Sequence, residues 1–117
     1  MANITQREVF IMEYRRFGNT IYLRLDPKEE ILEEIGKVAK KENIRLAQVT
    51  GLGAINDFTA GVYNTVTKEY HSIQFQGAFE IVSLTGTVTR KDGDVYLHLH
   101  IAAGDEEGHV HGGCLLY

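Results

Sequence analysis

Only one stretch of the chain has the residue spacing of an α-helix, and this limits the folds that the chain can adopt. Asp26-Pro27-Lys28-Glu29 supplies an Asp cap, a proline at the first helical position and a Glu that completes a capping box. We therefore predict a helix that begins at Asp26 and ends at Asn43. Apolar residues recur at helical spacing within it: Ile31, Leu32, Ile35, Val38 and Ala39.

The rest of the sequence is typical of strands separated by turns. Val9–Phe17 and Thr20–Leu25 flank Gly18-Asn19 and predict a hairpin. Gly51-Leu-Gly53 lacks the further residues of a nucleotide-binding loop and predicts a structural turn. The connections are short, so we expect an α+β fold, a mostly antiparallel sheet of about eight strands with one main α-helix packed on it. The six strands predicted after the helix are Ile44–Thr50, Phe58–Asn64, Tyr70–Phe75, Phe79–Arg90, Val95–Ala103 and His109–Leu116.

Length and composition agree with one folded domain, which we assign to residues 1–117. A chain of 117 residues with 44% hydrophobic and 24% charged residues can bury a core without cross-links. No run approaches the roughly 20 apolar residues that span a bilayer. The N-terminus lacks the pattern of a secretory signal, so we expect a cytoplasmic protein without membrane contact.

Charge is distributed unevenly along the chain. Nine of the twelve basic residues fall between Arg7 and Arg45, and none follows Lys91. The net charge of −4 opposes binding to phosphates by bulk charge, so any role with nucleic acid must be local or indirect. The acidic C-terminal quarter favours cation binding because it contains four of the five histidines: His98, His100, His109 and His111.

His98 and His100 are the first two candidate metal ligands. They alternate with Leu97, Leu99 and Ile101, so a strand directs both imidazoles to one face and the apolar residues to the other. Two such residues have Cα atoms roughly 6.5–7 Å apart, close enough to share one metal ion. The alternative is an exposed strand face that happens to carry two histidines.

The following strand can supply a third ligand, and its register decides which. A four-residue loop from Asp105 to Gly108 pairs Gly104 with His109 and brings His111 beside His100. A one-residue bulge at Gly112-Gly113 brings Cys114, the one cysteine of the chain, to that face instead. Either donor, with two imidazoles, suits zinc. We expect His109 and His71 to face solvent.

Three protein ligands leave a tetrahedral metal one open position for water or a substrate. Glu80 is a candidate assisting base, because it is a charged residue in the otherwise apolar start of the run Phe79–Gly86. Its alternative role is that of a strand-end carboxylate that accepts hydrogen bonds. A metal-binding cupin fits poorly, because the first glutamate after His100 is Glu106 and the spacing is too long.

Four segments together resemble the plants-and-prokaryotes-conserved (PPC) domain over nearly the whole chain from about Met12. The resemblance implies a sheet with one main helix, assembled as a homotrimer. Plant members of the family accompany DNA-binding hooks, and stand-alone prokaryotic members are called DNA-binding proteins by inference. The segments are Gly51-Leu-Gly-Ala54, Gly77-Ala-Phe-Glu-Ile-Val-Ser-Leu-Thr-Gly86, His98-Leu-His100 and Gly108-His-Val-His-Gly-Gly113.

The chain departs from the family pattern at its C-terminal end. Prokaryotic members have a His-Leu-His followed by Gly-Gly-His, and these histidines can hold zinc. His98 and His100 match, whereas the third place falls on Cys114, with His111 as a substitute. No Arg-Gly-Arg-Pro hook is present. The family pattern runs on for another strand after Tyr117, so we expect either a truncated or a shortened member that lacks a final C-terminal strand.

Two functions therefore follow from the sequence. The first is a zinc-binding homotrimeric PPC-domain protein that serves as a DNA-associated regulatory module. The second is a small zinc-dependent enzyme or ligand-binding protein with its site in a cleft between subunits near Glu80. Loss of a hydrolytic activity in His98→Ala would favour the enzyme.

Overall fold

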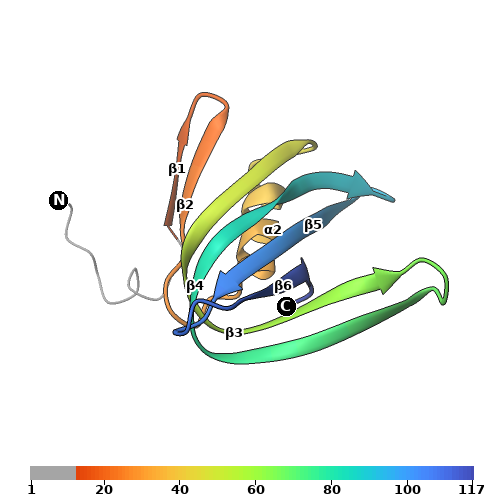
Figure 1. Cartoon of the computed structure of the whole chain (residues 1–117). Coiled ribbons are helices and arrows are strands. Elements are labelled where there is room, and N and C mark those ends of the chain that lie inside the picture. Colours follow the sequence, from red (N-terminus) through yellow and green to blue (C-terminus); the bar gives the residue numbers. More distant parts are fainter. Residues whose placement is uncertain (1–12) are drawn as a thin grey trace.

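The computed structural model describes residues 13–117, which form six strands and one helix (Figure 1). All strand pairs are antiparallel, which confirms the α+β class. Within these residues no helix is long and apolar enough to cross a membrane. The elements are β1 (Glu13–Phe17), β2 (Thr20–Arg24), α2 (Ile31–Lys41), β3 (Ala47–Asn64), β4 (Glu69–Lys91), β5 (Asp94–Gly104) and β6 (Val110–Leu115).

The β1–β2 hairpin forms as predicted, with Phe17 opposite Thr20 across the two-residue turn. The beginning of the predicted first strand, residues 9–12, lies outside the described part of the chain. The hairpin stands beside the larger sheet in Figure 1 and is held to the end of α2. Tyr14 and Arg16 both donate hydrogen bonds to the carboxylate of Glu42, at 3.0 and 3.1 Å.

The helix begins later than predicted. Pro27 and Lys28 form a turn in which Lys28 has a φ of 75°, and this left-handed backbone prevents a helix from starting at Asp26. The predicted contact between Asp26 and Glu29 still forms, because the Asp26 N–H donates to the Glu29 carboxylate at 2.6 Å. It closes this turn instead of capping the helix.

Glu30 is the N-cap of α2, and its carboxylate accepts a hydrogen bond from a first-turn N–H at 2.6 Å. The helix ends at Lys41, and Asn43 takes the left-handed conformation, with a φ of 50°, as expected just beyond a helix. Glu34 is buried, although its charge predicts an exposed position. The Lys37 ammonium lies 3.1 Å from the Glu34 carboxylate and compensates the buried charge.

β3 and β4 each join two segments that the sequence predicts as separate strands. β3 continues through Gly51-Leu-Gly53, where the predicted turn is wrong, with only a register shift against β4. β4 continues through Gly77, which has a φ of 143°. Because glycines and bulges bend a strand without ending it, the predicted number of about eight strands is too high and six are present.

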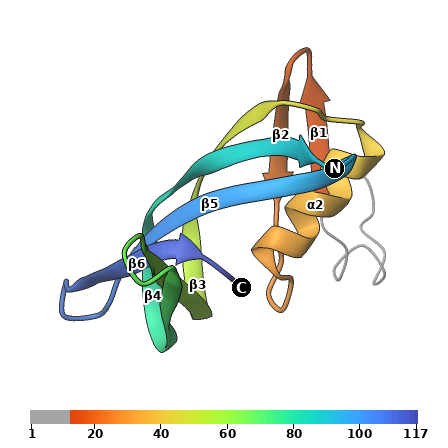
Figure 2. The same ribbon diagram turned by 90° about the vertical axis from the view of Figure 1, so that its right-hand side faces the viewer.

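β3, β4, β5 and β6 close into a ring in that order, because β6 returns to pair with β3 at Ala60 and Gly61. Figure 2 shows the strong curvature of these strands and α2 lying against β5. The apolar helix residues Ile31, Leu32 and Ile35 pack on the core. The buried core residues are Phe58, Ala60, Ile81, Leu84, Leu99, Ile101, Ala103 and Leu115.

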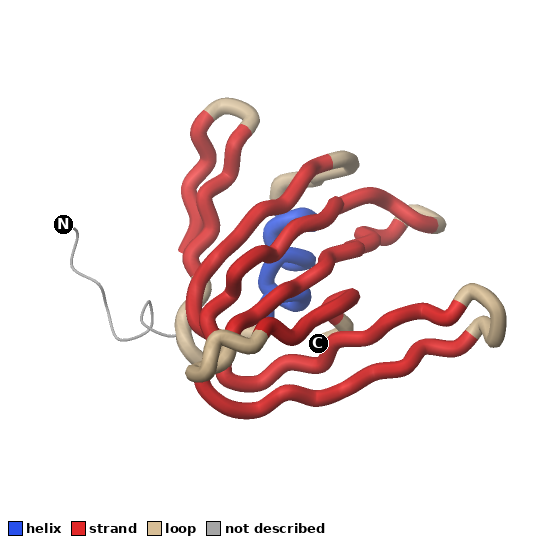
Figure 3. Tube along the Cα trace, in the orientation of Figure 1, coloured by secondary structure: helices blue, strands red, loops and turns tan. Residues whose placement is uncertain are grey.

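The end of β3 and the start of β4 form a hairpin that extends beyond the closed part of the sheet (Figure 3). We call the part of this hairpin from residue 62 to residue 73 the arm. The Asn64 side chain stabilises its turn, because Oδ1 accepts hydrogen bonds from the N–H groups of Val66 and Thr67 at 2.8 and 3.0 Å. Several large apolar side chains of the arm are exposed: Val62, Tyr63, Val66, Tyr70 and Ile73.

Candidate metal centre

β5 directs His98 and His100 to one face, as the alternation predicts. Leu99 and Ile101 are 0% and 2% exposed, whereas both histidines are exposed. Because successive side chains of a strand point to opposite faces, the apolar residues enter the core and the two imidazoles stay together outside it. Their ring centroids lie 5.0 Å apart, with the planes at 80°.

The register of β6 against β5 decides which residue joins the two histidines. The predicted four-residue loop is wrong, because Gly104 pairs with Val110 and His109 remains in the connection. This difference of one residue places Cys114 directly opposite His100. The pairing is therefore the one in which Cys114, and not His111, joins the two histidines. The one-residue shift arises because the loop is longer by one residue, and not from a bulge within β6.

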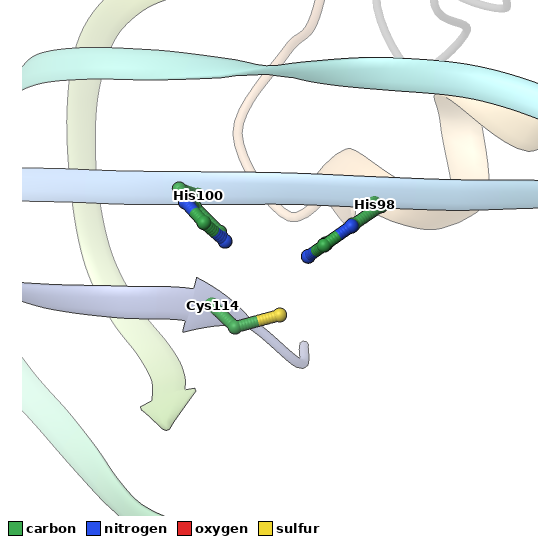
Figure 4. Close-up of side chains that lie close together, drawn as sticks. All are labelled: His98, His100 and Cys114. Atoms are coloured by element: carbon green, nitrogen blue, oxygen red, sulfur yellow. The ribbon is translucent and has the colours of Figure 1, made fainter. Parts of the chain in front are cut away.

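His98, His100 and Cys114 form a compact group of three donor residues. One ligand atom from each lies within 4.8 Å of the other two. Figure 4 shows the imidazoles extending from β5 toward Cys114 on β6, with the sulfur on the same side as the ring nitrogens. In a tetrahedral zinc site, bonds of about 2.0–2.3 Å hold the donor atoms roughly 3.3–3.6 Å apart. The donor types fit zinc, and a bound ion would draw the three atoms, now within 4.8 Å of one another, closer together.

Two glycines allow the strands to approach each other closely around this group. A Cβ atom at Gly112 would lie 1.9 Å from the carbonyl oxygen of Ile101, and one at Gly86 would lie 2.0 Å from that of His98. Both distances are far shorter than atomic contact permits, so any larger residue must push the backbones apart. Gly112 thereby fixes the spacing of β5 and β6, and Gly86 fixes that of β4 and β5.

His111 lies on the opposite face of β6 and outside the three-donor group. Its ring centroid is 5.1 Å from that of Phe75, and it meets Phe79 edge to face at 6.1 Å. Its Nε2 lies 3.0 Å from Oδ2 of Asp105. Packing and this hydrogen bond hold His111 against the core side, so the structure does not bring it to His98 and His100.

Asp105 organises the loop between β5 and β6. Its Oδ1 accepts hydrogen bonds from the backbone N–H groups of Glu107 and His109, each at 2.9 Å. The hydrogen bond from His111 contributes most to lowering the pKa of Asp105, the backbone N–H groups add to it, and burial opposes it. Because these contacts keep His109 inside the loop, they support the register that places Cys114 opposite His100.

Two tyrosines that no sequence motif marks, Tyr63 and Tyr70, form a wall beside the three donors. They are paired across the arm, and their ring centroids are 5.1 Å apart. Together with Ser83 and the donor residues they line a depression of about 520 Å³. The charge of the nearby Cys114 thiolate, more than burial, raises the pKa of Tyr70. Their sequence signal is weak: each stands at the end of a predicted strand beside the same turn.

Glu80 lies away from the three donors. It pairs with Ala54 of β3 and Gly104 of β5, and it lines a larger cavity between β2, α2 and β3 that contains none of the donors. The candidate base is therefore not beside the candidate metal. His109 is 71% exposed and His71 is also exposed, both as predicted.

Comparison with known proteins gives a consistent set of relatives. A "putative DNA binding protein" of Bacteroides thetaiotaomicron is 31% identical, with a TM-score of 0.86 over 90% of this chain and 73% of that one. A plant- and prokaryote-conserved (PPC) protein of Pyrococcus horikoshii is 36% identical, with a TM-score of 0.78 over 91% and 72%. A metal-containing protein of Archaeoglobus fulgidus is 25% identical, with a TM-score of 0.72 over 91% and 68%.

None of the curated proteins matches the chain. A family model does match, and it describes the Plants and Prokaryotes Conserved domain, for which both abbreviations, PCC and PPC, are in use. The match runs from Met12 to Tyr117 and includes both strands that carry the three donor residues. The chain therefore belongs to the Plants and Prokaryotes Conserved domain family.

Proposed function

We propose that this protein is a cytoplasmic, homotrimeric PPC-domain protein that binds zinc through His98, His100 and Cys114 and acts as a DNA-associated regulatory module. The observation that carries the metal site is the convergence of three donor atoms within 4.8 Å of one another. The relative from Archaeoglobus fulgidus is named as metal-containing. A cytoplasmic location suits the proposal, because reducing conditions keep a single cysteine available as a ligand.

The donor set favours zinc over magnesium or calcium. Imidazole and thiolate are preferred by zinc and by the later transition metals, whereas magnesium and calcium prefer oxygen. Within residues 13–117 no carboxylate belongs to this group of donors. Two imidazoles and one thiolate would give the metal three protein ligands and leave one position open, and these donors line the same depression as Tyr63 and Tyr70. A zinc ion in such a position can act as a Lewis acid.

Metal content and cobalt substitution test the site. Purified wild-type protein should bind one zinc per chain, and cobalt in its place should give the absorption band that a cobalt–thiolate bond produces. His98→Ala should bind much more weakly, and Cys114→Ser should lose the band. His109→Ala is the control, since this side chain is 71% exposed and outside the donor group. Equal binding by wild type and His98→Ala would overturn the proposed ligands.

The exposed apolar residues of the arm support the assembly into a trimer. Val62, Val66 and Ile73 are 65%, 87% and 48% exposed, and this much exposed apolar surface is unusual for a lone chain in water. Light scattering should give the mass of three 13.2-kDa chains. Val62→Glu places a charge in the proposed interface and should give monomers, whereas Tyr22→Glu on the β1–β2 hairpin should not. A wild-type monomer at micromolar concentration would contradict the assembly.

The net charge limits how the protein can associate with DNA. Several basic side chains are already paired with acids: Arg16 with Glu42 at 3.1 Å and Lys37 with Glu34 at 3.1 Å. With a net charge of −4 the protein has no overall excess of positive charge for phosphate contacts, and we expect it to act through a local surface of the trimer or through another protein. A duplex titration at several salt concentrations should show weak binding, and tight binding with a steep salt dependence would contradict an indirect role.

The depression beside the donors favours the alternative of a ligand-binding protein or small enzyme. Its volume of about 520 Å³ is in the range of small-molecule sites. Glu80 does not line it, so the assisting base of the enzyme hypothesis is missing from this side of the sheet. A hydrolytic activity that disappears in His98→Ala and persists in Glu80→Gln would support the enzyme without that base.

A further inference from the structure

We propose that Cys114 is also an oxidation site, and that hydrogen peroxide releases the bound metal by oxidising its sulfur. This inference rests on the proposed metal function. Cys114 is the one cysteine of the chain, and its Sγ is the only donor atom of the three that peroxide readily oxidises. The metal centre therefore has one redox-sensitive ligand and two redox-stable ones.

The position of Cys114 makes its sulfur accessible. The residue is partly buried and lines the depression shared with Tyr63 and Tyr70, while His98 and His100 at the same depression are exposed. A hydrogen peroxide molecule has only two heavy atoms, so a space of about 520 Å³ admits it easily. An oxidisable thiolate in the interior of the core would lack this access.

The chemistry is a two-electron oxidation of sulfur. The Cys114 thiolate attacks one oxygen of hydrogen peroxide, the S–O bond forms, the O–O bond breaks, and with one proton the products are Cys114 sulfenic acid and water. Sulfur is oxidised and peroxide is reduced. A sulfenic acid is a much weaker zinc ligand than a thiolate, so the metal is left with two imidazoles and dissociates.

The absence of a second cysteine determines how the site recovers. No cysteine of the same chain can trap the sulfenic acid as a disulfide. An external thiol must therefore condense with it, giving a mixed disulfide and water, and a second external thiol must then displace the first as a disulfide and return Cys114 to the thiol. The release of the metal is reversible only while such thiols are present.

The test uses zinc-loaded protein and a dye that absorbs when it captures released zinc. Peroxide should release the metal at the rate at which the free thiol disappears, and a sulfenic-acid trap should label Cys114 in the same samples. Dithiothreitol followed by zinc should restore binding. Retention of zinc after Cys114 has been labelled would overturn the proposal.

Met12→Leu is the matched control, because Met12 carries a sulfur that peroxide also oxidises and is not one of the three donor residues. It should bind zinc and release it at the wild-type rate under the same peroxide. Much slower release from Met12→Leu would assign the effect to methionine oxidation and overturn the proposal while leaving the metal site intact. Absence of zinc from untreated wild type would instead refute the proposed function, so the two failures are distinguishable.

Discussion

The two faces of β5 and β6 carry the same type of residue in opposite settings. On the outer face, His98 and His100 are exposed and lie beside Cys114, with donor atoms within 4.8 Å of each other. On the inner face, His111 packs on Phe75 and lies 3.0 Å from a carboxylate oxygen of Asp105. The outer histidines keep nitrogens available for a ligand, whereas the inner one already has partners.

This difference shows that the position of a histidine relative to the sheet decides its role. His111 and Cys114 are three residues apart on one strand and therefore face opposite sides. One extra residue in the loop after Gly104 selects which of them joins His100. The loop contacts of Asp105 and the close packing of Gly112 thus decide which donors make up the proposed metal centre.

Gly112→Ala should have the largest effect, because it disturbs both faces at once. The new Cβ would lie 1.9 Å from the carbonyl oxygen of Ile101, so β5 and β6 must separate. We expect the free energy of unfolding to fall by about 3 kcal/mol, measured by denaturant titration, and metal binding to be lost. Gly104→Ala is the matched control, since its Cβ meets its nearest neighbour, Val82, at an ordinary 3.7 Å. Equal stability of the two variants would refute the close approach.

His100→Ala should affect the outer face alone, because it removes one proposed metal ligand without weakening the fold. Its ring is exposed, so the free energy of unfolding of the metal-free protein should change by less than about 0.5 kcal/mol. The dissociation constant for zinc should rise at least about 100-fold, measured by competition with a chelator. An unchanged constant would mean that the outer face holds no metal.

His111→Ala should have the opposite pattern. Loss of the contacts with Phe75 and Asp105 should lower the free energy of unfolding by about 1–2 kcal/mol. Zinc affinity should stay within about threefold of wild type, because the ring is outside the donor group. His109→Ala, with its exposed side chain, serves as the control. A large loss of affinity in His111→Ala would assign this residue to the metal centre after all.

Asp105→Asn should give the smallest effect and a specific dependence on pH. The hydrogen bond from His111 lowers the pKa of Asp105 in the folded state below its ordinary value of 3.8. The stabilisation by the ionised carboxylate is therefore present above that value and is lost as the pH falls through the lowered pKa. Unfolding at several pH values should show the difference between wild type and variant shrinking in acid. Glu106→Gln, at an exposed position, should show no such trend.

Local patterns in the sequence predict the fold class, the β1–β2 hairpin and the side of β5 on which each side chain lies. Alternation around Leu99 predicts which side carries His98, because it depends on one strand alone. The helix start at Asp26 fails, because a capping signal does not reveal that Lys28 adopts a φ of 75°. The predicted number of strands is too high, partly because the sequence predicts a strand break near Gly77. There the glycine bends β4 without ending it.

The third donor could be narrowed to two residues from the sequence but not chosen. Cys114 and His111 exchange places with a shift of one residue, and that shift depends on hydrogen bonds made by Asp105 with its own loop. The Tyr63–Tyr70 wall depends on pairing across the arm, which no short motif encodes. The third donor and the tyrosine pair both depend on contacts between distant segments, so they could be identified only in the three-dimensional structure.

Anomalous diffraction at the zinc absorption edge, on crystals of zinc-loaded protein, tests the proposed metal centre most directly. We expect one peak per chain, at about 2.0–2.3 Å from a ring nitrogen of His98, a ring nitrogen of His100 and the sulfur of Cys114. A peak between His111 and Asp105, or no peak beside the three donors, would contradict the assignment of these ligands.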